Sequence, residues 1–149
     1  MDSYEINRET CAIISVDENN ARVLEEKNEY FVNQNTYEIM DNSCQYYGSS
    51  CEGRIKGTKM ILGSNYKVPI VVEDSNNLII FPTTSPQSED CAWISLKWVS
   101  NIEKVDLYNT KIIFDNDKEI IVPCSFRSIE NQLSRASRLD LILRNRKNS

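Results

Sequence analysis

The chain has 149 residues, a net charge of −5 and a hydrophobic share of 40%. This length predicts one domain, and the hydrophobic share provides enough apolar side chains for a core, which argues against global disorder. The longest apolar runs have four residues, whereas a membrane-spanning helix needs roughly 20. We therefore expect a cytoplasmic protein with neither a signal peptide nor a membrane segment.

Most of the chain predicts short β-strands separated by turns rich in Asn, Asp and Pro. Residues 21–29 are charged and ambiguous, with a strand as one alternative. The clearest hairpin joins two apolar runs across residues 115–118. In chain order, strands are expected at residues 10–16, 30–32, 36–40, 59–62, 68–72, 78–81, 111–114 and 119–122.

The apolar period changes to that of a helix near Ser128, which suits the N-cap position. Ile129, Leu133, Ala136 and Leu143 fall close to one helical stripe. Many short strands followed by one helix predict an α+β domain with mainly antiparallel strands and hairpins and a C-terminal α-helix.

We interpret residues 1–149 as a single domain made of three parts. Residues 1–40 form acidic N-terminal strands, residues 41–127 form a glycine loop with a β core, and residues 128–146 form a basic C-terminal helix.

All four glycines fall between residues 48 and 63. Because glycine permits positive φ and close backbone approach, this stretch predicts a loop whose shape matters, set by Gly48, Gly53 and Gly57. Backbone amides beside several cations suit a phosphate-rich partner. The alternative is a tight surface loop with ordinary solvated charges.

Charge is unevenly distributed along the chain. Residues 1–30 contain eight acidic and three basic residues, whereas residues 125–149 contain two acidic and six basic ones. A polarised charge distribution directs one face toward a polyanion even when the total is acidic. The alternative is a basic terminal segment without a partner.

Five scattered cysteines and the absence of histidine limit the possible chemistry. Cys11, Cys44, Cys51, Cys91 and Cys124 form no Cys-x-x-Cys pair, so we expect reduced thiols without disulfides or zinc. Without histidine there is no Ser-His or Cys-His nucleophile. We predict no enzyme and no cofactor. Catalysis by Cys44 or Cys51 is the least favoured alternative.

Five short motifs follow one another along the chain. They are the glycine-rich stretch of residues 43–58, Lys67-Val-Pro69-Ile70, Phe81-Pro82-Thr83, Cys91-Ala-Trp93-Ile94 and Ser128-Ile-Glu130-Asn131-Gln132 with Arg135. Together they resemble the signature of the bacterial competence transcription factor ComK family across about residues 4–139. Each motif is short, but five in this order are specific.

The resemblance implies a DNA-binding activator of genes for DNA uptake. It implies binding to AT-rich promoter boxes, largely through the minor groove, by dimers that pair on DNA. It also implies control by an adaptor and a Clp-type protease. Family members usually carry a longer C-terminal extension tied to this control, so the sequence resembles a short form of the family.

A protein that reads AT tracts in the minor groove needs Arg or Lys in the groove and Asn or Gln for the A·T pattern. We expect Arg54 and Arg135 to enter the groove. The full set of predicted DNA-binding residues is Arg54, Lys56, Lys59, Lys67, Arg127, Asn131, Gln132, Arg135, Arg138, Arg144, Arg146 and Lys147. The alternative from another class is a protein-interaction module of this family with weak or no DNA binding.

Overall fold

The computed structural model describes residues 1–148, which form an α+β fold as predicted. In chain order, the elements of this part of the chain are β1 (Thr10–Asp17), β2 (Asn20–Glu25), β3 (Glu29–Val32), α1 (Thr36–Tyr46), α2 (Cys51–Leu62), β4 (Ile70–Glu73), β5 (Leu78–Pro82), β6 (Trp93–Ser95), the 3-10 helix η1 (Leu96–Trp98), β7 (Val99–Lys104), β8 (Thr110–Phe114), β9 (Glu119–Val122) and α3 (Phe126–Lys147).

A six-stranded sheet forms the centre of the fold, with strand order β3-β2-β1-β6-β5-β4 and antiparallel pairing throughout. Its central pairing places Ala12 opposite Ile94 and Ile13 opposite Trp93. Successive side chains of a strand point to opposite faces, so these two pairs enter different cores. Both faces of β4, β5 and β6 are buried, so these strands are apolar runs rather than alternating patterns.

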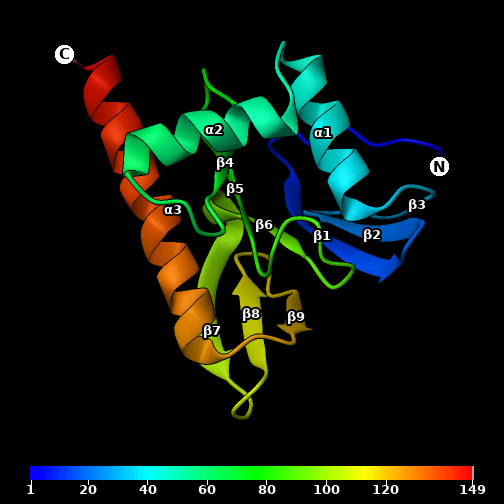
Figure 1. Cartoon of the computed structure of the whole chain (residues 1–149). Coiled ribbons are helices and arrows are strands. Elements are labelled where there is room, and N and C mark those ends of the chain that lie inside the picture. The colour runs from blue at the N-terminus through cyan, green and yellow to red at the C-terminus, as the bar shows by residue number, and fades with distance from the viewer. Residues whose placement is uncertain (149) are drawn as a thin grey trace.

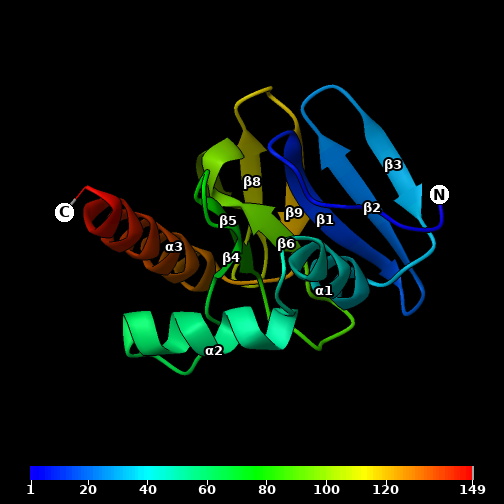
Figure 2. The ribbon, with the colours of Figure 1, turned by 90° about the horizontal axis from the view of Figure 1, so that it is seen from above.

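The two faces of this sheet are covered differently (Figures 1 and 2). Helices α1 and α2 cover one face, where Ile39 and Met40 pack with Ile13 and Trp93. The three-stranded antiparallel sheet β7-β8-β9 and helix α3 cover the other, where Phe114 joins the second core. Helix α2 runs past the β4 edge and contacts α3 there.

Residues 36–46 and 51–62 are helical, so the strands expected at residues 36–40 and 59–62 are wrong. Asn35 caps α1, because its side chain accepts a hydrogen bond from the Glu38 amide at 2.8 Å and the Glu38 carboxylate accepts one from the Asn35 amide at 3.3 Å. This reciprocal pair is a capping box. Ser50 caps α2 with a single hydrogen bond, which its side chain accepts from the Gly53 backbone amide at 3.0 Å.

The prediction of a glycine loop is therefore also wrong. Gly53 and Gly57 lie inside α2, whereas Gly48 and Gly63 have positive φ, at 87° and 65°. Gly63 is the left-handed C-cap of α2, and its amide donates to the Lys59 carbonyl at 2.9 Å. Left-handed glycine is the common way to end a helix. Two of the four glycines thus end helices, and two are ordinary helix positions.

Helix α3 begins earlier than predicted. Its N-cap is Ser125 instead of Ser128, and the helix continues through Asp140 without interruption. Its buried residues are Ile129, Gln132, Ala136, Leu139 and Leu143, which repeat at three- and four-residue spacing. In the described part of the chain, no helix is long and apolar enough to span a membrane.

Candidate nucleic-acid interface

Helices α2 and α3 meet beside edge strand β4, and several cations lie on these elements (Figures 1 and 2 show the helices and the strand). We call this surface the basic junction. It consists of Lys59 on α2, Lys67 in the segment of residues 63–69, and Arg127, Asn131, Arg135 and Arg138 on α3. Asn131 lies four residues after Arg127 and seven before Arg138, so these three share the exposed side of α3. The structure brings Lys67 close to Arg135 through Tyr66 and to Lys59 in one pocket, and the other three predicted residues lie on the same helix as Arg135.

Gln132 holds the basic junction together from inside. Its side chain is fully buried, and its amide nitrogen donates to the backbone carbonyls of Lys67 at 2.8 Å and Pro82 at 2.6 Å. Its amide oxygen accepts a hydrogen bond from the Arg135 guanidinium. With both ends of the amide engaged inside the protein, Gln132 has no surface to offer to DNA. We therefore assign it a positioning role and not the DNA contact expected from the sequence.

Lys67 has an unusual backbone for a residue with a side chain. Its φ of 41° lies in the left-handed region, which costs a non-glycine residue roughly 1 kcal/mol or more. The hydrogen bond from Gln132 to its carbonyl helps to hold this conformation. The Lys67 ammonium lies 3.3 Å from the hydroxyl of Ser128, in the first turn of α3. The strained backbone thus directs a cation toward α3.

The Tyr66 ring contacts the two cations of the basic junction that are best fixed. The Lys67 ammonium is 4.8 Å from the centre of the Tyr66 ring, and the Arg135 guanidinium carbon is 5.7 Å from it. These distances are typical of cation–π contacts. The sequence analysis missed Tyr66, because a single tyrosine after a polar turn carries no periodic or motif signal.

A pocket of about 300 Å³ opens beside Tyr66, between α1, α2 and two loops. Lys59 and Lys67 line it together with Asn65, Ser85 and other polar and apolar groups, and no carboxylate lines it. The pocket is therefore locally positive although the whole chain has a net charge of −5, and a locally positive site attracts anions.

Other predicted residues of α2 lie apart from the basic junction. Arg54 and Lys59 are five residues apart, so they point about 140° away from each other around the helix. Arg54 is half-buried, and its Nε atom has no hydrogen-bond partner within residues 1–148. Lys56 is exposed and forms an ion pair with Glu52 at 3.2 Å. The sequence suggested that a loop projects Arg54, but in the structure Arg54 is part of α2.

Arg54 lies close to a buried pair of thiols. A hydrogen bond with Cys51 and, to a smaller extent, the charge of Arg54 lower the pKa of Cys44 despite its burial. The same thiol–thiol hydrogen bond, together with burial, raises the pKa of Cys51. Both cysteines are fully buried, so neither reaches a substrate at the surface. Residues 1–148 contain no group of three or more His, Cys, Asp and Glu side chains arranged to hold a metal ion.

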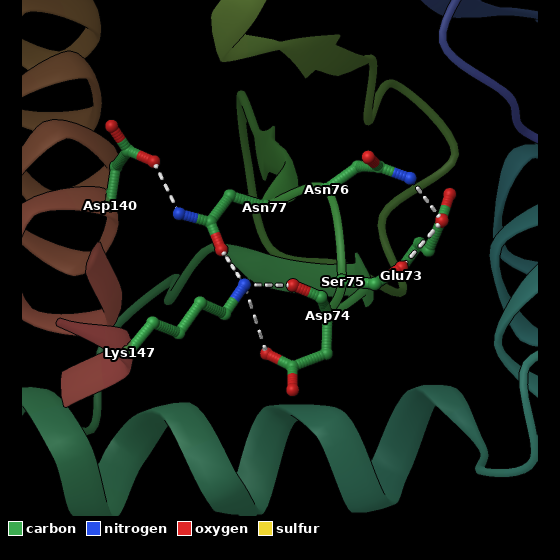
Figure 3. Close-up of polar contacts among 7 residues, drawn as sticks. All are labelled: Glu73, Asp74, Ser75, Asn76, Asn77, Asp140 and Lys147. Atoms are coloured by element: carbon green, nitrogen blue, oxygen red, sulfur yellow. Dashed lines mark hydrogen bonds and ion pairs between the residues drawn. The ribbon is translucent and has the colours of Figure 1, made fainter.

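Two cations at the end of α3 form hydrogen bonds and ion pairs with other residues of the protein. Figure 3 shows Lys147 donating to the Asp74 carbonyl and the Asn77 side chain in the β4–β5 turn, and its ammonium also lies 3.9 Å from the Asp74 carboxylate. Arg144 pairs with Asp140 at 2.9 Å, and Asn77 donates to Asp140 at 3.1 Å. These groups attach the last turns of α3 to the sheet. Arg146 is exposed on the same helix.

Comparisons with known proteins agree with the motifs in the sequence. The family model described as ComK protein matches residues 1–148. A curated relative, the competence transcription factor of Bacillus subtilis (strain 168), is 33% identical over 140 residues, which is 92% of this chain and 73% of the relative. No solved structure matches the chain.

Proposed function

The chain belongs to the ComK protein family, and on this basis we propose that it is a sequence-specific DNA-binding activator of competence genes. In this proposal it binds AT-rich boxes in promoter DNA, largely through the minor groove. The relative of 33% identity is a competence transcription factor, which supports the proposal. No catalytic step is part of it.

The observation that carries the proposal is the separation of charge along the six-stranded sheet. The acidic residues 1–30 include β1 and β2, which lie toward one edge with β3, and the basic junction lies at the β4 edge. An acidic protein can approach DNA only if its acidic part stays away from the phosphates, because like charges repel. The sheet order keeps the two regions apart.

The basic junction also has suitable chemistry. Arg135 and Lys67 are held in defined positions by Gln132 and Ser128, and Asn131 is exposed beside them. A narrow AT-rich minor groove attracts arginine and lysine, and an amide side chain suits its A·T hydrogen-bonding pattern. Arg127 and Arg138 flank this group as phosphate contacts.

The proposal includes self-association on DNA. One module of this size presents few groups that read bases, and dimers that pair half-sites gain specificity from their spacing. Analytical ultracentrifugation with a duplex carrying two AT boxes tests this point. Two or more protomers per duplex are expected, and a strict 1:1 complex at micromolar protein contradicts it. Control by an adaptor and a Clp-type protease is also part of this proposal, on the family resemblance alone.

A second candidate function is a protein-interaction module of the same family. The engagement of Lys147 by Asp74 and Asn77, and the burial of Gln132, favour it, because they remove cations and amides from the DNA-binding set. Fluorescence anisotropy with AT-rich and GC-rich duplexes at a stated salt concentration separates the two. Tighter binding to the AT-rich duplex supports the activator, and equal weak binding supports the module.

A further inference from the structure

Tyr66 is an exposed aromatic side chain in the middle of the basic junction. It lies in the segment of residues 63–69 that joins α2 to β4, and 62% of its surface is exposed. A single exposed aromatic side chain is common on protein surfaces, so what distinguishes Tyr66 is its place beside two cations. The residues around Tyr66 indicate which partner it contacts.

The backbone that follows Tyr66 is fixed. Lys67 follows it with a left-handed φ of 41° and a carbonyl bonded to buried Gln132. Val68 and Pro69 are buried immediately afterwards. A side chain carried on such an anchored segment loses little conformational entropy on binding. Tyr66 is thus presented rigidly, although its ring is exposed.

The surroundings of Tyr66 are cationic, unlike those of another exposed tyrosine. Lys67 and Arg135 approach the Tyr66 ring, and no carboxylate lines the adjoining pocket. Tyr108, at the tip of the β7–β8 hairpin, is 75% exposed, but its amide donates to the carboxylate of Asp106 at 2.8 Å. The environment of Tyr66 suits a polyanion, and that of Tyr108 does not.

We propose that Tyr66 inserts its ring between two neighbouring base pairs of the AT-rich box and partly unstacks them. This inference rests on the proposed function and extends it by naming the residue that deforms the DNA. Proteins that bind the minor groove commonly insert an apolar side chain between base pairs. Pyrimidine–purine steps such as TA unstack most easily, so insertion favours AT-rich sites without hydrogen bonds to bases.

The two cations complete the insertion. Lys67 and Arg135 lie over the ring at 4.8 and 5.7 Å from its centre, so insertion moves them off the ring and turns them toward the phosphates that flank the opened step. Neutralising those phosphates lowers the repulsion that opposes bending toward the protein. Tyr66, Lys67 and Arg135 therefore act as one unit.

The competing role for Tyr66 is a brace that only positions the two cations through its ring. Replacement by leucine separates the roles, because leucine can also insert between base pairs but has no π face for a cation. Tyr66→Phe keeps both properties, and Tyr66→Ala removes both. Tyr108→Ala removes another exposed tyrosine, one without a cation over its ring in the described part of the chain, and is the control.

The test uses AT-rich duplexes with 2-aminopurine at successive adenine positions, since its fluorescence rises when it is unstacked. Binding is measured on the same duplexes by anisotropy. The wild type, Tyr66→Phe, Tyr66→Leu and Tyr108→Ala are expected to raise the fluorescence at one step of the box. Tyr66→Ala is expected to abolish the rise and to weaken binding by between about fivefold and a hundredfold, the loss typical of one aromatic–base contact.

Insertion is overturned if the wild type saturates the duplex without a rise at any position, or if Tyr66→Ala keeps the rise. It is also overturned if Tyr66→Leu behaves like Tyr66→Ala, because the ring then acts only by positioning Lys67 and Arg135. These outcomes leave the proposed function intact. Absence of binding by the wild type overturns the proposed function as well. Circular dichroism and melting of each variant confirm that it is folded.

Discussion

The buried amide of Gln132 donates a 2.8 Å hydrogen bond to the carbonyl of Lys67, which lies 65 residues earlier in the chain. This bond connects the core-facing side of α3 to the strained turn that presents a cation. The stability of the fold and the geometry of the basic junction therefore depend on the same side chain.

Replacing Gln132 by leucine is expected to lower the free energy of unfolding by about 1–3 kcal/mol, because the carbonyls of Lys67 and Pro82 lose their buried donor. Urea denaturation measures the change. Asn131→Leu, at the exposed neighbouring position, is the control and should change stability by less than about 0.5 kcal/mol. Equal effects at the two positions would contradict the positioning role of Gln132.

The glycines should respond to alanine in opposite directions. A Cβ at Gly57 meets no atom within 4 Å and the residue is helical, so Gly57→Ala should stabilise the fold by about 0.5–1 kcal/mol. Gly48 has a φ of 87°, so Gly48→Ala should destabilise it by roughly 1–2 kcal/mol. Thermal melting tests both. A fall in melting temperature for Gly57→Ala would mean that its backbone is not helical.

Much of the β-structure was predictable from sequence, because short apolar runs bounded by turn residues indicate buried strands. The runs at 78–81, 111–114 and 119–122 became β5, β8 and β9 almost residue for residue. Strand β7 was not predicted, since its edge position leaves it mostly exposed and without an apolar pattern.

The error at residues 36–62 has a physical cause. Thr36 and Ile39 favour strands by intrinsic propensity, but the capping box at Asn35 and Glu38 and the tertiary packing of Ile39 and Met40 decide for a helix. Within the candidate site, the charge distribution along the sequence indicated the cations of α3, and the motifs indicated Lys67. The burial of Gln132 and the position of Tyr66 depend on contacts between residues far apart in sequence, which no local pattern reports.

Alkaline pH should destabilise the protein through its buried thiols. Burial raises the pKa of Cys11 from an ordinary 9.0 to about 11. The folded state then retains a proton that the unfolded chain loses, so stability falls as pH rises from 9 to 11. One such group contributes a slope of at most about 1.4 kcal/mol per pH unit.

Urea denaturation at several pH values measures this slope in the wild type and in Cys11→Ala. The variant should be less stable at neutral pH, because alanine leaves a cavity, but its stability should fall less steeply above pH 9. Parallel curves for the two proteins would show that Cys11 does not titrate in this range.

The salt dependence of DNA binding should distinguish free cations from engaged ones. Arg138 is exposed on the outer side of α3, so Arg138→Ala should lower the slope of log K against log salt by about 0.9, the value for one phosphate contact. Lys147 is held by Asp74 and Asn77, so Lys147→Ala should leave the slope nearly unchanged. Anisotropy titrations between 50 and 200 mM salt measure both slopes. A larger change for Lys147→Ala would move the interface toward the end of α3.

The central claim is that the basic junction reads AT-rich DNA, and one comparison tests it most directly. Anisotropy titrations with AT-rich and GC-rich duplexes are run on the wild type, Lys67→Ala, Arg135→Ala and the control Lys97→Ala, which removes a cation packed on Trp98 outside the junction. Loss of either junction cation should weaken AT-rich binding by about 1–3 kcal/mol and remove the AT preference, whereas the control keeps both. Full affinity and full AT preference in Lys67→Ala and Arg135→Ala would contradict the account.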